Sequence, residues 1–362
     1  MNVLLLDTNV SSYPIYESLL YRGYTVFVAG SNPDDCLALS STNYLKFDYS
    51  DFDLLIQFTK DYDIDFVLPG CNDLSYKMAA KYNQIFKCGL NLESPEIDDI
   101  INNKHLFKDF AIRIGLSVPQ KINFLEIFEY TDYPIIIKPT DSYSGKGVTV
   151  LNEYNEQEVK DAIELAKNNS KSSSFFIEKF VQGQLYSHTT FINNGKIELD
   201  FIVEEHCNFY PYAVDQSWVL DHSDCSFLEE IRSEIQKMIA ALELKPGLIH
   251  TQFIYSNGKV KILEVTRRCP GDLYAKLIEY STGLNYAKLF TEMVLNLDFD
   301  FNYYLKKNKI IRETIHYKGS AYYTIKLETY SNIKEFVPIV KTGSIINKNT
   351  SRVGILFYTN EL

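Results

Sequence analysis

The stretch "PIIIKPTDSYSGKGVTVL", residues 134–151, decides how the rest of the sequence is interpreted. Lys138 ends an apolar run, and Lys146 lies in the small-residue loop that follows, flanked by two glycines. A P-loop requires GxxxxGK, then Ser or Thr, then a helix, whereas Lys146 is followed by glycine and strand-forming residues. The pattern therefore predicts a strand, a flexible loop and a strand, in which Gly145 and Gly147 let backbone amides approach phosphate oxygens.

The overall composition limits the classes of protein that this sequence can encode. The chain has 362 residues, of which 46% are hydrophobic, so two or three domains with buried cores are expected. Asp and Glu (47) outnumber Lys and Arg (36), and the net charge of -11 disfavours a nucleic-acid partner. The sequence lacks a run of about 18 apolar residues, so we expect no membrane span and no membrane partner. Six cysteines without a CxxC pair predict reduced thiols in a cytoplasmic protein.

The first hundred residues alternate strand and helix patterns. The apolar runs "NVLLLD", "YTVFVAG" and "DFVLPG" predict strands, and "YPIYESLLYRG" and "DFDLLIQFTKDY" predict the helices between them. This alternation predicts an open parallel sheet, with Pro69 and Gly70 at its carboxyl edge, where ligands tend to bind. Because "DTNVSSYP" follows the first strand in place of GxGxxG, the dinucleotide-binding fingerprint is missing.

Later segments add further functional patterns. The run "LIHTQFIYSNGKVKILEVT" predicts a hairpin that turns at Asn257 and Gly258. Its two strands carry Gln252 and Glu264, and paired strands can place two such oxygen ligands for magnesium on one face. The sequence "VTRRCPG" follows directly, and its guanidinium groups suit a substrate carboxylate or an acyl phosphate.

The order and spacing of these motifs resemble the ATP-grasp superfamily, closest to its biotin carboxylase and carboxylate-amine ligase branches. The resemblance extends to about Leu297. It implies an α/β and α+β ATP-grasp fold with an N-terminal open parallel-sheet domain. The implied parts are a Rossmann-like pre-ATP-grasp domain (1–95), a small subdomain with a glycine-rich flap (96–183), a central subdomain with a metal site (184–300) and a small mixed C-terminal subdomain (301–362).

The resemblance also implies the site residues. Lys104 and Lys138 match two lysines that contact phosphates, and "EKFV" matches a hinge whose backbone meets adenine. The expected ATP-binding residues are Lys104, Lys138, Ser144, Gly145, Lys146, Gly147, Glu178, Lys179, Phe180, Val181 and Gln184. The expected catalytic residues are Lys138, Arg267 and Arg268. The expected ligands of Mg²⁺ or Mn²⁺ are Glu264, Gln252 and Thr266, although Gln252 replaces the usual Glu and Thr266 the usual Asn.

The implied function is an ATP-dependent, ADP-forming ligase that joins a small-molecule carboxylic acid to an amine through an acyl phosphate. One alternative keeps the fold and uses bicarbonate as the acid, as a carboxylase does. A second alternative is a catalytically inactive nucleotide-binding regulator, suggested by Gln252 and Thr266. A homodimer is expected from the resemblance. The sequence names neither the acid nor the amine.

Overall fold

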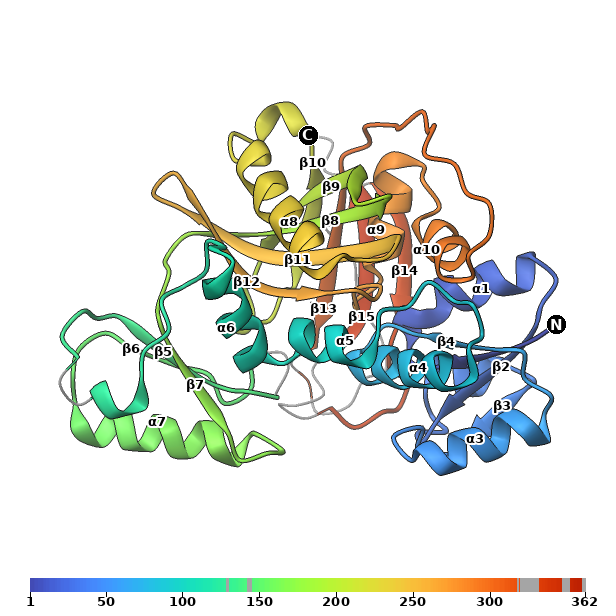
Figure 1. Ribbon diagram of the computed structural model, residues 1–362, viewed down its shortest axis with the longest axis horizontal. Helices are drawn as coiled ribbons and strands as arrows, with labels where there is room; N and C mark the ends of the chain where they lie inside the picture. Colours follow the sequence, from blue (N-terminus) through green and yellow to red (C-terminus); the bar gives the residue numbers. More distant parts are fainter. Residues whose placement is uncertain (128–129, 142–144, 318, 320–331, 347–351, 360–362) are drawn as a thin grey trace.

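Three sheets and the helices packed on them organise the described part of the chain. The computed structural model describes residues 1–127, 130–141, 145–317, 319, 332–346 and 352–359. Figure 1 shows the N-terminal sheet on one side, the smallest sheet projecting on the other side, and the largest sheet between them. The combination of one parallel and two antiparallel sheets confirms the predicted α/β and α+β class. Among the described residues, the structure has no helix that is both long and apolar enough to cross a membrane.

The first sheet contains four parallel strands in the order β3-β2-β1-β4. The strands are β1 (Asn2–Leu6), β2 (Thr25–Gly30), β3 (Tyr44–Lys46) and β4 (Phe66–Pro69). The helices are α1 (Tyr13–Tyr21), α2 (Cys36–Ser40), α3 (Phe52–Asp61) and α4 (Asp73–Phe86). The chain order reverses between β1 and β4, and open parallel sheets bind ligands at the carboxyl ends of the strands at such a point. The segments that follow β1 and β4 therefore form the functional edge of this sheet.

Two helices link the first sheet to the rest of the protein. They are α5 (Pro95–Asn102) and α6 (Lys104–Arg113). The Asn103 side chain caps α6 by accepting hydrogen bonds from the amides of His105 and Leu106, at 3.0 and 3.2 Å. This cap makes Lys104 the first residue of α6. Apolar side chains of α5 and α6 pack with α8 (Leu228–Leu242) against the largest sheet.

The smallest sheet is antiparallel, in the order β6-β5-β7. Its elements are β5 (Ile135–Pro139), β6 (Thr149–Leu151), β7 (Phe175–Lys179) and the covering helix α7 (Glu156–Asn168). Ile135 and Ile137 alternate with outward residues and are fully buried under α7. The pairing of β5 with β6 confirms the predicted strand, loop and strand, and it places Lys138 near the end of β5.

The largest sheet contains eight antiparallel strands in the order β12-β11-β8-β9-β10-β13-β15-β14. The strands are β8 (Gln184–Asn193), β9 (Lys196–His206), β10 (Gln216–Leu220), β11 (Gly247–Ser256), β12 (Lys259–Thr266), β13 (Ile310–His316), β14 (Asn332–Pro338) and β15 (Arg352–Thr359). Helices α9 (Tyr274–Thr282) and α10 (Tyr286–Val294) cover one face. The predicted hairpin is confirmed, because β11 and β12 pair across Asn257 and Gly258, which both have positive φ, 51° and 74°.

The C-terminal segment contributes to this same sheet. Residues 301–362 were expected to form a small mixed subdomain after a boundary at residue 300. Instead β13 pairs with β10, and β15 and β14 extend the sheet beyond it. Strand pairing is long-range, so the sequence pattern of the tail did not reveal its partner. Side chains of β13 and β15 can therefore reach the same cleft as those of β11 and β12.

A buried ion pair joins the N-terminal part to the largest sheet. Arg267, which follows β12, lies 2.9 Å from Glu93, and the side chains are 1% and 0% exposed. Arg267 also donates to the Lys245 carbonyl at 2.7 Å. Charges removed from water in this way require a partner, since one left alone is strongly destabilising.

The substitution Glu93→Gln should therefore lower the free energy of unfolding by about 3–5 kcal/mol, because it leaves the Arg267 charge buried without its counter-ion. Asp99→Asn is the control, since the Asp99–Lys77 pair is about half exposed and should contribute less than about 1 kcal/mol. Urea unfolding measures both values. Equal losses in the two variants would contradict the assigned role of Glu93.

Candidate active site

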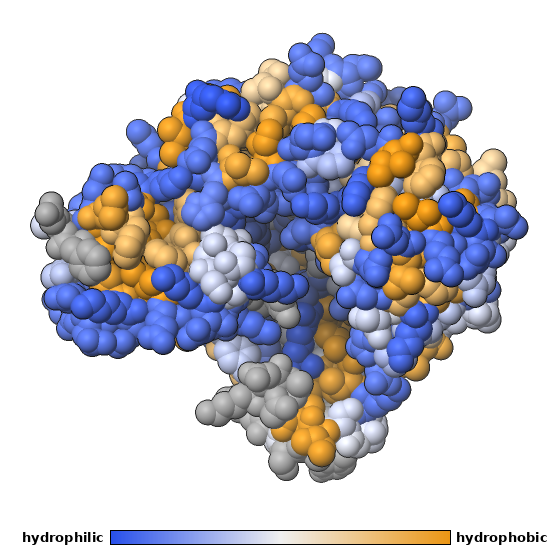
Figure 2. Space-filling view, turned by 60° about the horizontal axis from the view of Figure 1, so that its bottom comes forward, coloured by the Kyte–Doolittle hydropathy of each residue, from blue (hydrophilic) through white to orange (hydrophobic). Residues whose placement is uncertain are grey.

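Three charged side chains from three separate elements converge in the cleft between the smallest and largest sheets. Lys104 begins α6 and donates to the Pro139 carbonyl at 3.2 Å, which brings it to the end of β5 beside Lys138. Burial lowers the pKa of Lys104, against the opposing effect of the nearby Glu264 carboxylate on β12. Figure 2 shows a hollow at the centre of one face, bordered mainly by hydrophilic side chains. Two ammonium groups beside one exposed carboxylate form an arrangement suited to phosphate groups and a cation.

The Glu178 carboxylate holds the second lysine in place. Its Oε2 lies 2.5 Å from Lys138 Nζ, and its Oε1 pairs with Lys108 of α6. Glu178 and Lys108 are each 2% exposed, whereas the Lys138 side chain is 20% exposed and opens to the cleft. Burial alone would raise the pKa of Glu178, but the two ammonium groups outweigh it and hold this pKa below its ordinary value. The carboxylate therefore stays ionised at neutral pH and fixes Lys138.

A row of polar side chains crosses the face of the largest sheet that forms the floor of the cleft. Gln252 on β11 lies directly opposite Glu264 on β12. Gln252 Nε2 also donates to Glu205 Oε2 on β9 at 2.6 Å. Glu205 pairs in register with Ser217, and Ser217 with Arg312 on β13, so all these side chains lie on one face. Burial raises the pKa of Glu205 to about 7.

The donor atoms on this floor fit a divalent cation that is shared with phosphate groups. Among the residues that the structure describes, no three His, Cys, Asp or Glu side chains gather as a metal site. Mg²⁺ at phosphate-binding sites takes only one or two protein carboxylates, because phosphate oxygens and water complete its shell. Glu264, with the side-chain oxygens of Gln252 and Thr266 on the paired strands, matches that need.

Arg268 connects the floor to the functional edge of the first sheet. Its Nε donates to Asp73 Oδ1 at 2.7 Å, and Asp73 is the first residue of α4, just after β4. Thr266 Oγ1 lies 3.4 Å from the same carboxylate oxygen. The Arg268 side chain is 18% exposed and that of Asp73 57% exposed. This ion pair therefore borders the cleft, where a ligand can reach both partners.

Two further guanidinium groups lie next to this pair, and both come from the C-terminal strands. Arg312 is 2% exposed, donates to the Asp272 carbonyl at 2.8 Å and lies 3.5 Å from the Asp272 carboxylate. Arg352 pairs with the same carboxylate. Asp272 in turn donates its amide to Ser11 Oγ of the N-terminal edge at 2.9 Å. The two guanidinium groups share the Asp272 carboxylate, and Arg312 also lies near the carboxyl groups of Glu205 and Asp215.

Comparison with known proteins agrees with this geometry. Residues 131–275 match the sequence profile of the ATP-grasp domain. The chain contains an ATP-grasp domain. It is 26% identical over 219 residues to the C-terminal section of the carbamoyl phosphate synthase large chain of Aquifex aeolicus, which covers 56% of this chain and 38% of that protein. It is 27% identical over 224 residues to phosphoribosylamine–glycine ligase of Streptococcus pneumoniae, which covers 58% of this chain and 52% of that protein.

Solved structures extend the ATP-grasp likeness to the whole chain. The L-amino acid ligase from Bacillus licheniformis superposes with a TM-score of 0.80 at 16% identity, over 99% of this chain and 92% of that one. Phosphoribosylglycinamide synthetase from Anaerococcus prevotii gives a TM-score of 0.75 at 19% identity, over 100% and 94%. At such identities the likeness shows the ATP-grasp fold alone. The chain spans about half or less of the curated relatives that it matches.

Backbone and side-chain hydrogen bonds hold the segment that was predicted to be the hinge, residues 178–181. The amides of Lys179 and Phe180 donate to the Gln120 and Pro134 carbonyls at 2.9 and 3.0 Å, which leaves the Val181 amide as the next donor along the segment. The Lys179 ammonium donates to the carbonyls of residues 132 and 133, at 2.7 and 3.0 Å, so it faces the protein rather than the cleft. Gln184 Nε2 likewise donates to backbone carbonyls. The adenine contact expected at the Val181 backbone stays a prediction.

The glycine-rich flap contacts a loop on the opposite side of the cleft. Ser144 lies outside the described residues, as do residues 142 and 143. Gly145 and Gly147 have φ of 70° and 74°, and Lys146 between them is exposed. A Cβ atom on Gly145 would lie 2.7 Å from the Pro211 carbonyl oxygen, so this approach requires glycine. Gly145 therefore lies against the loop between β9 and β10.

The structure also changes the predicted set of catalytic residues. The guanidinium of Arg267 is paired with Glu93 in the protein interior, away from the cleft, which argues against the predicted catalytic role of Arg267. Near Arg268 the structure places Asp73, Arg312 and Arg352, which sequence reasoning did not single out. A residue such as Asp73 could have been found from its place just after the "DFVLPG" strand, at the expected ligand edge. The sequence around Arg312 and Arg352 has no comparable pattern that predicts a functional site.

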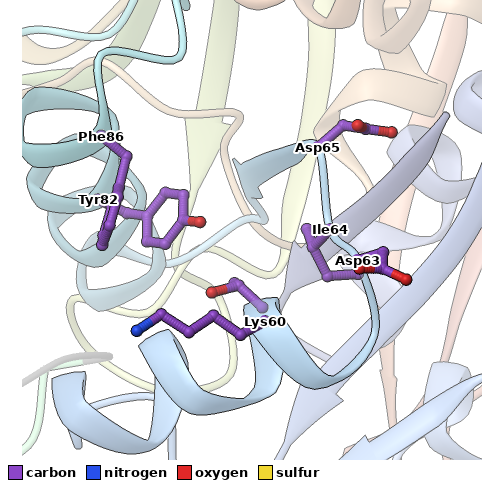
Figure 3. A pocket seen from close by; sticks show the side chains of 7 residues that line it. Lys60, Asp63, Ile64, Asp65, Tyr82 and Phe86 are labelled. Carbon is purple, nitrogen blue, oxygen red and sulfur yellow. The ribbon is translucent and has the colours of Figure 1, made fainter.

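A separate pocket lies beside the first sheet, near the start of β4 (Figure 3). It is lined by Thr59, Lys60, Asp63, Ile64, Asp65, Tyr82 and Phe86. Ile64 and Asp65 precede β4, whereas Asp73 follows it. The pocket is therefore at the opposite end of the strand from the candidate active site.

The buried carboxyl of Asp98 gives a pH-dependent prediction. It lies in α5, is 1% exposed and accepts from Asn102 Nδ2 at 2.6 Å. Burial, assisted by the carboxylates of Asp73 and Asp99, raises the pKa of Asp98 to about 7. A raised pKa means that the folded state holds this proton more tightly than the unfolded state. The stability contributed is therefore full at low pH and is lost as pH rises through about 7.

The variant Asp98→Asn stays neutral at every pH and keeps the acceptor for Asn102. Its stability relative to the natural protein should therefore increase from pH 5 to pH 8. Thermal unfolding of both proteins at the two pH values measures the difference. A gap of the same size at pH 5 and pH 8 would show that Asp98 ionises normally in the fold.

Proposed function

We propose that this protein is an ATP-dependent, ADP-forming ligase that joins a carboxylic acid to an amine through an acyl phosphate. The observation that supports the proposal is the meeting of Lys104, Lys138 and Glu264 in one cleft, with the Arg268 guanidinium beside them. Phosphoryl transfer needs positioned positive charge more than covalent catalysis. The carbamoyl phosphate synthase and ligase names of the relatives are consistent with that chemistry.

Arg268 would position the acid. Its guanidinium group is fixed by Asp73 and partly exposed, and planar guanidinium groups bind carboxylates in a defined orientation. One carboxylate oxygen attacks the γ-phosphorus of ATP, the bond to the β-γ bridging oxygen breaks, and ADP leaves with that electron pair. Lys104 and Lys138 would stabilise the charge spread over the transferring group. The flap would exclude water, which otherwise hydrolyses the acyl phosphate.

The amine completes the reaction in a second step. Its nitrogen lone pair attacks the acyl carbon, the carbon–oxygen bond to phosphate breaks, and inorganic phosphate leaves with the electron pair. The proton that the nitrogen loses passes to phosphate or solvent. Arg268, at the border of the cleft, would stabilise the oxyanion of the tetrahedral intermediate.

A divalent ion, Mg²⁺ or Mn²⁺, would supply charge neutralisation at the phosphates when bound. Glu264 would be its carboxylate ligand, with oxygens of Gln252 and Thr266 as weaker partners. The amide nitrogen of Gln252 already binds Glu205, which leaves its oxygen as the ligand atom.

The direct experiment is a matrix of acids and amines assayed for ADP and phosphate release, with mass spectrometry of the product. Release that requires one acid and one amine supports the ligase. Release that depends on bicarbonate as the acid would support a carboxylase of the same fold. Nucleotide binding without turnover for every pair, bicarbonate included, would support an inactive nucleotide-binding regulator.

The substitution Lys138→Ala should reduce ADP formation about a hundredfold or more, because it removes one charge from the transferring phosphoryl group. The fold should persist, since Glu178 keeps its ion pair with Lys108. Lys160→Ala is the matched control in the same subdomain, because Lys160 pairs only with the exposed Glu156 on α7. Steady-state ADP release measures both. Turnover near that of the natural protein in the Lys138 variant would remove this lysine from the mechanism.

A further inference from the structure

The carboxylate of Asp73 differs from its neighbours at the functional edge of the first sheet. Asp7, after β1, is buried and accepts from Ser12 Oγ at 2.7 Å. Asn72 caps α4 by accepting from the Ser75 amide at 2.9 Å. Asp73 instead reaches out of its own domain to Arg268, with more than half of its side chain exposed. Helix capping therefore does not require Asp73, and its carboxylate is available to the cleft.

The Asp73–Arg268 pair places one charge of each sign at the border of the cleft. On the first sheet, each strand is followed by an aspartate a few residues later, at positions 7, 35, 48 and 73. On the floor, Arg268 is joined by Arg312 and Arg352, which share one carboxylate. A ligand that lies across this boundary meets a carboxylate at one end and a guanidinium at the other. A zwitterion has the complementary charges.

We infer that the acid substrate of the proposed ligase is an α-amino acid, which enters the Asp73–Arg268 ion pair and separates its partners. Its carboxylate takes the place of Asp73 at Arg268, and its ammonium pairs with Asp73. Each charge of the original pair then keeps a counter-ion, so opening the pair leaves no charge unpaired in the cleft. The inference rests on the proposed function and names the substrate class of that site.

The contact between Asp73 and the bound amino group would also determine which amine attacks the acyl phosphate. An amine is nucleophilic only when it is unprotonated, and a neighbouring carboxylate stabilises the protonated form. The amino group held by Asp73 would therefore remain an ammonium while the adjacent carboxylate is phosphorylated. The acyl phosphate is then attacked by the second amine rather than by the amino group of another molecule bound in the same way. Asp73 is thus a specificity-determining residue.

A structural role for Asp73 can be separated by experiment from its proposed role in recognising the substrate. Acidic residues in the first turn of a helix interact favourably with the helix dipole, and Asp73 is at that position in α4. Asp53 occupies the first turn of α3 in the same domain and is exposed. Asp53→Asn therefore removes a comparable dipole interaction without changing the cleft.

The experiment compares Asp73→Asn, Asp53→Asn and the natural protein on matched acids that differ only in the amino group. The pairs are L-alanine and propionate, L-leucine and 4-methylpentanoate, and L-phenylalanine and 3-phenylpropionate. ADP release is measured with hydroxylamine as the amine, so that an acyl phosphate appears as a hydroxamate. Calorimetric titration of each acid in the absence of ATP provides a second readout.

The natural protein should convert amino acids and not the matched acids without the amino group. Asp73→Asn should raise KM for the amino acid by about tenfold to a hundredfold, as expected for the loss of one charge-assisted hydrogen bond, with a smaller change in kcat. Asp53→Asn should leave both parameters unchanged. Equal conversion of both kinds of acid, or an equal effect of Asp73→Asn on both, would overturn the inference.

Failure of the inference can be distinguished from failure of the proposed function. Hydroxamate formed only from acids without an amino group would retain the ligase and reject the α-amino acid. If ADP release occurs with none of the acids, the ligase proposal fails, and calorimetry decides the inference. Amino acid binding that Asp73→Asn weakens would then support it, and the absence of amino acid binding to the natural protein would reject it.

Discussion

The buried carboxylate of Glu178, held between Lys108 and Lys138, is the interaction on which the candidate active site depends. A charge this far from water is tolerated only with close counter-ions, so β7, β5 and α6 must meet at one point. The same contact limits the freedom of a lysine that would otherwise move in solvent. The ammonium group proposed to bind phosphate is thereby positioned before any ligand arrives, which would reduce the ordering cost of binding.

The remaining parts of the site are arranged around that point by strand pairing. β11 and β12 place Gln252 opposite Glu264, and the cap of α6 places Lys104 beside the end of β5. The C-terminal strands continue the same sheet and bring Arg312 to its floor. The first sheet supplies Asp73 from its functional edge. The cleft therefore has a lysine side and a guanidinium side, and the proposed reaction would place the carboxylate of the acid between them.

Much of this arrangement was predictable where the information is local. The alternation around Lys138 and the turn at Asn257 and Gly258 are short-range patterns, and both are confirmed. The exact opposition of Gln252 and Glu264 was not predictable, because a register shift between Gln252 and Phe253 moves the pairing by one residue. Residues whose partners are distant in sequence were not predictable. Arg267 and Arg268 are adjacent, yet one is buried against Glu93 and the other faces the cleft, because successive side chains of an extended segment point to opposite sides. Arg312 and Arg352 lie on β13 and β15, and no local sequence pattern revealed how these two strands pair.

The most direct measurement is a crystal structure with a non-hydrolysable ATP analogue and Mg²⁺. The account predicts the terminal phosphates within hydrogen-bonding distance of the ammonium groups of Lys104 and Lys138, the metal ion on Glu264, and the base against the backbone at Val181. Lys138 should keep its ion pair with Glu178 in that complex. A nucleotide bound outside this cleft, or phosphates that contact neither lysine, would contradict the central claim that these residues form one ATP site.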